Sequence, residues 1–162
     1  MIKSTNIGFW IVTAIATLVP IALARLGIDL YLMPQIEVGI TFFLSIYTRP
    51  KTWIFFLYGL FIDVAYGNPL GVNALILVLL NYIIAKFKPN LSKQSMRMII
   101  ICFIYSILGI SFLKYIIFTI YYASEIAPYY SDILINILIN ILFYPLLHLL
   151  LSNRKHYKNH EN

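Results

Sequence analysis

The turn that decides the fold of this chain reads GLFIDVAYGNPLGVNA over residues 59–74. Gly59, Asp63 and Gly67 are spaced by four, so on a helix they share one face and let a neighbouring helix approach closely. Asn68 followed by Pro69 predicts a helix start, with Asn as the N-cap and Pro at the first helical position. The helix after the turn therefore begins beside Asp63, where its free N–H groups can receive the carboxylate.

Three interpretations of Asp63 follow from this placement. The first is structural, because a carboxylate near a membrane interior is costly unless a helix N-terminus or another donor satisfies it. The second makes Asp63 a proton carrier or cation ligand, and the third makes it a contact for a partner protein. The structural interpretation is favoured over transport, since the two segments that flank the turn hold no second carboxylate.

Outward from the turn, the chain is strongly apolar. Of its 162 residues, 61% are hydrophobic and 11% charged, and the charges gather between long apolar runs. This is the pattern of an all-α, polytopic membrane protein, for which we expect one membrane domain over residues 1–162 with a short cytoplasmic tail at 152–162. About six transmembrane helices are predicted, near residues 7–26, 33–47, 53–66, 70–87, 98–122 and 132–151. The second and third are short for a span, which predicts thin or deeply buried helices.

The basic residues give an orientation. Arg49, the cluster between Lys86 and Arg97, and the tail after Arg154 all fall on one side of the predicted helices. The positive-inside rule makes that side cytoplasmic, with both termini there. The net charge of +6 is thus explained by loops, and no continuous basic face for nucleic acid is present.

Lys114 interrupts the fifth apolar segment about 16 residues from its start, which places it in the outer half of the bilayer at about 1.5 Å per residue. Glu37, Asp63 and Asp132 map to the same outer half. A buried ammonium needs an anionic partner or a route to water, so we expect Asp63 or Asp132 to be its counter-ion.

A polar stripe follows the sixth segment, in which residues recur every four positions: Asp132, Asn136, Asn140, Tyr144 and His148. In lipid such a stripe must face protein, and interhelical hydrogen bonding is favoured over a partner-binding face. Pro145 is expected to kink this helix.

Catalytic and cofactor motifs are missing from the sequence. It contains no phosphate loop, dinucleotide fingerprint, nucleophile elbow or zinc-helix motif, and its single cysteine, Cys102, allows no internal disulfide. We therefore expect no catalytic residue, no cofactor and no metal.

The turn and its flanks resemble the MreD family of bacterial rod shape-determining proteins. The resemblance is carried by Gly59, Asp63, Gly67, Leu70, Gly71 and Ala74. Pro34 before the second segment and Asn140 with Pro145 in the last are similar to the family pattern, and the length fits. Lys114 is not part of that pattern. We expect partner or interhelical contacts from Lys114, Asn136, Asn140 and Pro145.

The resemblance implies a non-catalytic component of the elongasome in the bacterial cytoplasmic (inner) membrane. It implies MreC as the direct partner, with MreB, RodA and a penicillin-binding wall synthase in the same complex that directs side-wall peptidoglycan synthesis. It also implies a fold similar to the substrate-binding subunits of energy-coupling factor transporters.

That last similarity keeps a second function open, a substrate-binding subunit for a vitamin-type small molecule. It predicts an outward-facing polar cavity, whereas a scaffold predicts a cavity that is filled or lined by lipid. A third class, a membrane enzyme acting on lipid or wall precursors, lacks the necessary catalytic groups.

Overall fold

The described part of the chain is entirely helical. A computed structural model describes residues 18–20, 22–23, 26–27, 33–48, 51–91, 95–121 and 130–156. Its helices are α2 (Ile36–Tyr47), α3 (Thr52–Tyr66), α4 (Val72–Leu91), α5 (Met96–Tyr121) and α6 (Tyr130–His156). They lie where hydropathy predicts apolar segments, with ends that differ by a few residues. The first predicted segment, near 7–26, falls largely outside the described residues.

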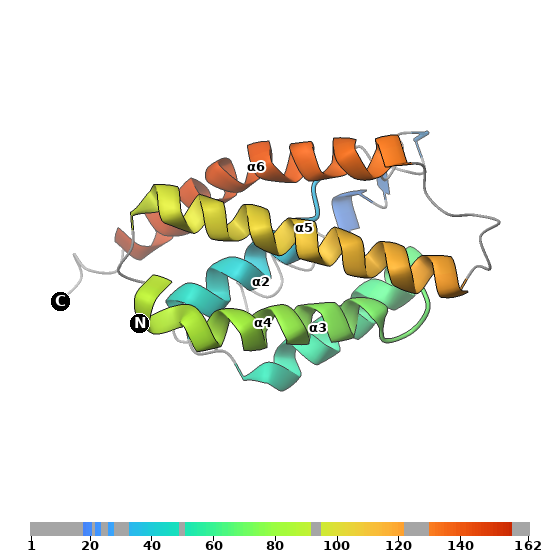
Figure 1. Ribbon diagram of the computed structural model, residues 1–162, viewed down its shortest axis with the longest axis horizontal. Coiled ribbons are helices and arrows are strands. Elements are labelled where there is room, and N and C mark those ends of the chain that lie inside the picture. The colour runs from blue at the N-terminus through green and yellow to red at the C-terminus, as the bar shows by residue number, and fades with distance from the viewer. Residues whose placement is uncertain are drawn as a thin grey trace.

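The helices are arranged around α2. It packs against α4 on one side and α6 on the other, while α3 pairs with α4 and α5 with α6 (Figure 1). With 12 residues, α2 is only about 18 Å long, well short of a bilayer's hydrocarbon core of about 30 Å. Its residues from Glu37 to Ile46 are all buried. The short second segment is thus a deeply buried helix in the middle of the bundle.

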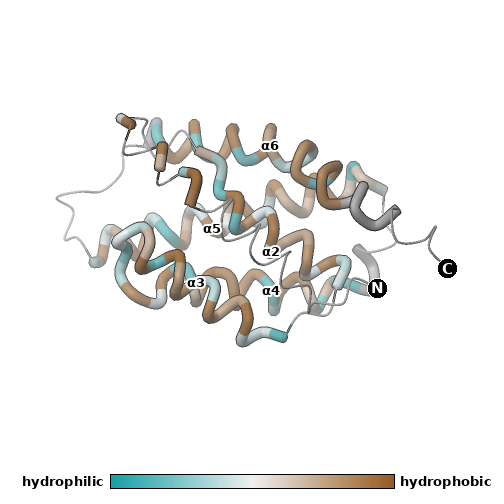
Figure 2. Tube along the Cα trace, turned by 180° about the vertical axis from the view of Figure 1, so that it is seen from behind, coloured by the Kyte–Doolittle hydropathy of each residue, from teal (hydrophilic) through white to brown (hydrophobic). Residues whose placement is uncertain are grey.

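Two helices in the described ranges are long and apolar enough to cross a bilayer, over Met96–Tyr121 and Asp132–Leu151. Hydrophobic residues cover most of the helical tube (Figure 2). Large apolar side chains remain exposed on the outside of the bundle, such as Phe112 of α5 at 67% and Leu142 of α6 at 77%. Such surfaces are suited to lipid, where apolar side chains need no cover.

The core between the helices is held by aromatic rings. Phe42 of α2 meets Phe103 and Tyr144 edge to face at centroid distances of 5.2 and 5.5 Å, and Phe103 stacks on Tyr144 at 3.9 Å. All three rings are fully buried. This cluster fixes α5 and α6 against α2 and so positions the polar groups that lie toward one end of the bundle.

Candidate functional site

The turn between α3 and α4 is built around Asp63. This side chain is fully buried near the end of α3. Its carboxylate accepts hydrogen bonds from the Gly71 N–H at 2.8 Å, and from the backbone N–H and side-chain amide of Asn73, both at 2.9 Å. The start of α4 therefore satisfies the charge of Asp63, as the structural interpretation of the sequence expects.

The predicted start of α4 is wrong in detail. Asn68 and Pro69 lie in the turn, and the helix begins at Val72, where the Leu75 N–H reaches the Gly71 carbonyl at 2.8 Å. Asp63 of the preceding helix performs the capping that the sequence assigned to Asn68, since it binds the first free N–H groups of α4.

The glycines of the turn have two different roles. A Cβ on Gly59 would overlap the backbone of Ala74, so Gly59 gives the close approach of α3 and α4 that its spacing predicts. Gly67 has open space around it, so close contact between helices does not require glycine there. Its φ of +68° does, because α3 ends in the left-handed conformation at this residue. There the Asn68 N–H donates to the Asp63 carbonyl at 2.9 Å. The shared-face explanation is thus wrong for Gly67.

Gly71 and Leu70 complete the turn. Gly71 has a φ of +98°, a conformation that side chains disfavour. Leu70 is 73% exposed and so makes little packing contact within the chain.

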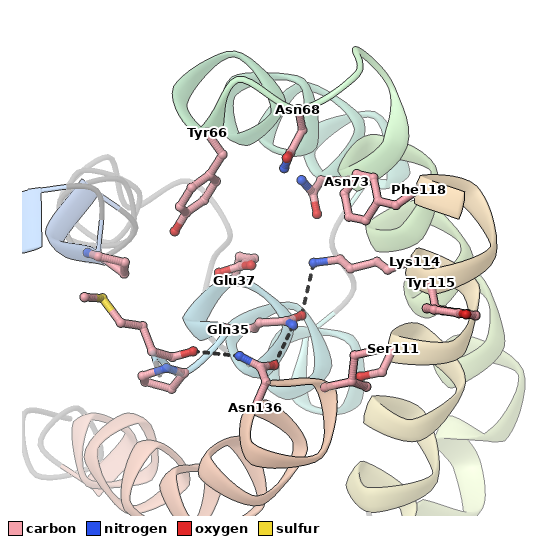
Figure 3. Close-up of a pocket in the computed structure, with 14 residues that line it drawn as sticks. Gln35, Glu37, Tyr66, Asn68, Asn73, Ser111, Lys114, Tyr115, Phe118 and Asn136 are labelled. Carbon is pink, nitrogen blue, oxygen red and sulfur yellow. Dashed lines mark hydrogen bonds between the residues drawn. The ribbon is translucent and has the colours of Figure 1, made fainter. Parts of the chain in front are cut away.

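Beside this turn lies a cavity of about 220 Å³, whose mostly apolar lining includes several polar side chains. It is bounded by the start of α2, the turn before α4, the second half of α5 and the start of α6 (Figure 3). Its lining includes Gln35, Glu37, Tyr66, Asn68, Asn73, Ser111, Lys114, Tyr115, Phe118 and Asn136. The cavity lies at the opposite end of the helices from the basic residues Lys51, Lys86, Lys88 and Arg97.

Gln35 links several polar residues that line the cavity. Its side-chain amide donates to Asn136 Oδ1 at 2.8 Å and accepts from Lys114 Nζ at 3.1 Å, and its backbone N–H donates to Asn140 Oδ1 at 2.8 Å. Asn136 in turn donates to the Met33 carbonyl at 3.0 Å. The segment before α2 is therefore fastened to both α5 and α6.

The expected counter-ion of Lys114 is not found. Its ammonium bonds to the neutral amide of Gln35, and within the described residues it forms no ion pair with Asp63 or Asp132. Asp63 is occupied by the start of α4, so it acts on Lys114 only as a more distant charge, after Glu37. Glu37 is 4% exposed and lines the same cavity.

The polar stripe of α6 faces protein as expected, and Asn136 and Asn140 use their side chains for contacts within the chain. His148 lies within 3.0 Å of the Tyr47 hydroxyl, toward the other end of the bundle. The Tyr144 hydroxyl has no hydrogen-bond partner in the described part of the chain. Pro145 lies inside α6, where it removes one backbone donor.

Sequence reasoning missed Gln35, Asn73 and the site role of Glu37. Gln35 and its partner Lys114 are 79 residues apart in the sequence, and Asn73 and its partner Asp63 are 10 apart. No local periodicity therefore identifies these residues. The available signals were polar residues at the predicted outer ends of apolar segments. Among the described residues, no group of three or more His, Cys, Asp or Glu side chains is arranged to hold a metal.

These features define a small all-helical protein with two candidate membrane spans in its described part and a cavity at one end of the helices. The family model described as rod shape-determining protein MreD matches residues 3–154, nearly the whole chain. The chain therefore belongs to the MreD family, whose members are non-catalytic membrane proteins that determine rod cell shape. No curated protein and no solved structure matches it, so the similarity to transporter subunits stays a prediction.

Proposed function

We propose that this chain is the membrane component of an elongasome that couples MreC and MreB to side-wall peptidoglycan synthesis by RodA and its penicillin-binding partner. The observation that carries the proposal is the family match over residues 3–154, which assigns the chain to rod shape determination. The chemistry of the described residues supports a scaffold. Several of its buried polar side chains connect one segment of the bundle to another, as Asp63 does with the start of α4 and Asn140 with Gln35 before α2.

The orientation is part of this proposal. Lys51, Lys86 and Arg97 are exposed and lie at one end of the helices, which the positive-inside rule makes cytoplasmic. Lys88 at the same end donates to the Thr48 carbonyl and ties α4 to the end of α2. In this orientation both termini are cytoplasmic, and the cavity with Lys114 opens to the outer side of the cytoplasmic membrane.

One observation favours a second candidate, a substrate-binding subunit of a small-molecule transporter. A scaffold predicts a cavity filled by side chains or lined by lipid, yet the outer cavity is open, and its mostly apolar walls carry several amides, one acidic and one basic side chain. Pockets with a few convergent polar groups are typical of ligand sites.

Affinity purification distinguishes the two candidates. The tagged chain is expressed in its own bacterium at native level, extracted in mild detergent, and the copurifying proteins are identified by mass spectrometry. The elongasome proposal predicts MreC, RodA and the wall synthase. Recovery of an ATPase pair of a transporter without MreC would overturn it and support the second candidate.

The variants for this experiment follow from the turn. Asp63→Ala and Gly67→Leu disturb the α3–α4 junction. If MreC is lost from both variants, the partner contact lies at that junction or depends on it. Gly109→Ala is the matched control, because a Cβ there meets nothing within 4 Å.

A further inference from the structure

The outer cavity contains an acidic and a basic side chain that form no ion pair with each other. Glu37 enters it from the first turn of α2 and Lys114 from α5, and both side chains point into the same space (Figure 3). No ion pair joins them or links either to another described residue. The amide of Gln35 lies beside Lys114 and takes one of its bonds.

Each charged group keeps unused bonding capacity. An ammonium has three N–H donors, and Lys114 uses one of them on Gln35 at 3.1 Å. A carboxylate accepts at both oxygens, and no other described residue donates to that of Glu37. Glu37 is 4% exposed, so this capacity is directed into the cavity and not into bulk solvent.

Two of the neighbouring amides already bond to other described residues. Gln35 is fixed between Lys114 and Asn136, and Asn73 donates to Asp63. Asp63 already accepts three hydrogen bonds from the start of α4, and these bonds stabilise its carboxylate. Among the described residues that line it, the cavity thus offers one basic and one acidic side chain, Lys114 and Glu37.

Buried charges are costly unless paired or hydrogen-bonded, so a bound group that carries both opposite charges would satisfy this cavity best. A simple anion would be repelled by Glu37, and a simple cation would be repelled by Lys114. We propose that Lys114 and Glu37 form a two-point site for a zwitterion, which places its anionic group on Lys114 and its ammonium group on Glu37.

The volume limits the size of the zwitterion. About 220 Å³ has room for about seven water molecules and is smaller than the roughly 300–1,000 Å³ of pockets for drug-sized ligands. A group the size of an amino acid fits, whereas a nucleotide does not. A free amino acid and the head group of phosphatidylethanolamine share this chemistry, and the proposal is independent of the partner that the chain binds.

The test uses the full chain in lipid nanodiscs of phosphatidylglycerol, with binding followed by the shift of its thermal midpoint. Glycine and phosphoethanolamine are the zwitterionic probes, and acetate and ethylamine carry one charge each. We expect both zwitterions to stabilise the protein and the single-charge probes to have little effect. Nanodiscs that contain phosphatidylethanolamine, examined by native mass spectrometry, show whether a lipid is retained and so distinguish the two sources.

Variants assign the two contacts. Glu37→Gln and Lys114→Met should each weaken zwitterion binding by about thirtyfold or more, whereas Lys114→Arg should retain it. Lys86→Met is the matched control, since it removes an exposed lysine at the other end of the bundle and should leave binding unchanged. Unchanged binding in Glu37→Gln or Lys114→Met would overturn the proposal.

The wild-type protein alone also decides the question if a variant does not fold. Acetate or ethylamine that binds as tightly as glycine would contradict a two-point site. So would the absence of binding by glycine, phosphoethanolamine and phosphatidylethanolamine alike.

Discussion

Asp63 and Asn73 are joined by two hydrogen bonds to one oxygen, because the backbone N–H and the side-chain amide of Asn73 both donate to Asp63 Oδ1 at 2.9 Å. The contact lies between the end of α3 and the start of α4. A carboxylate that would be costly in a membrane thus replaces the local cap of the next helix. The residues that resemble the family signature thus form, in this chain, a junction between two helices.

Removal of the Asp63 carboxylate should destabilise this junction. Asp63→Ala leaves the N–H groups of Gly71 and Asn73 without their acceptor, and we expect the free energy of unfolding to fall by about 2–3 kcal/mol. Asp63→Asn keeps one acceptor oxygen and should cost about half as much. Reversible unfolding in mixed detergent micelles measures both. Val64→Ala, at an exposed neighbour, is the control and should change stability by no more than about 0.5 kcal/mol.

The close approach of α3 and α4 depends on Gly59. Gly59→Ala places a Cβ against the backbone of Ala74, so the helices must separate, and we expect a loss of about 1–3 kcal/mol. Gly109→Ala is the same substitution in the interior of α5 with nothing within 4 Å, and it should be neutral or stabilising by up to about 1 kcal/mol. Thermal midpoints in one detergent compare the two. Equal effects at both positions would contradict the close packing at Gly59.

The left-handed end of α3 makes a graded prediction at Gly67. Its φ of +68° and ψ of +24° are tolerated by Asn but not by a β-branched residue. Gly67→Val should therefore lower stability by about 1–2 kcal/mol, and Gly67→Asn by clearly less. The same unfolding assay measures the order. A larger loss with Asn than with Val would contradict the left-handed backbone conformation as the reason for glycine there.

Asn140 ties α6 to the segment before α2. Asn140→Leu removes the acceptor of the Gln35 N–H and two donated bonds to Asn136, for an expected loss of about 0.6–2 kcal/mol. Leu142→Ala changes a side chain of the same helix that is 77% exposed, and it should have little effect. Equal stability of Asn140→Leu and the wild-type protein would show that the network contributes nothing to the fold.

Hydropathy predicts the helices well because bilayer thickness and apolar runs leave few alternatives for a segment such as α5. The contact of Asp63 with α4 is also predictable, since both partners lie within one short turn. The residue at which α4 begins is not. Asn68 and Pro69 carry strong helix-start signals, yet α4 begins at Val72 because a distant carboxylate provides the cap.

The cavity could not be predicted from spacing. Lys114 and Gln35 are 79 residues apart, and their contact depends on how α5 packs beside the start of α2. Electrostatics alone suggested an acidic counter-ion, but Asp63 is engaged by backbone N–H groups that sequence patterns do not place in space. A neutral amide can also accept a bond from an ammonium, and no charge rule identifies it.

Depletion of this chain from its own bacterium tests the account most directly. Cell length and width are measured by microscopy while the chain is removed and then supplied again as the wild type, Asp63→Ala or Gly109→Ala. The account predicts that depleted cells widen and round, and that the wild type and Gly109→Ala restore rods while Asp63→Ala does not. Cells that keep their rod shape without the chain would contradict the assignment to rod shape determination.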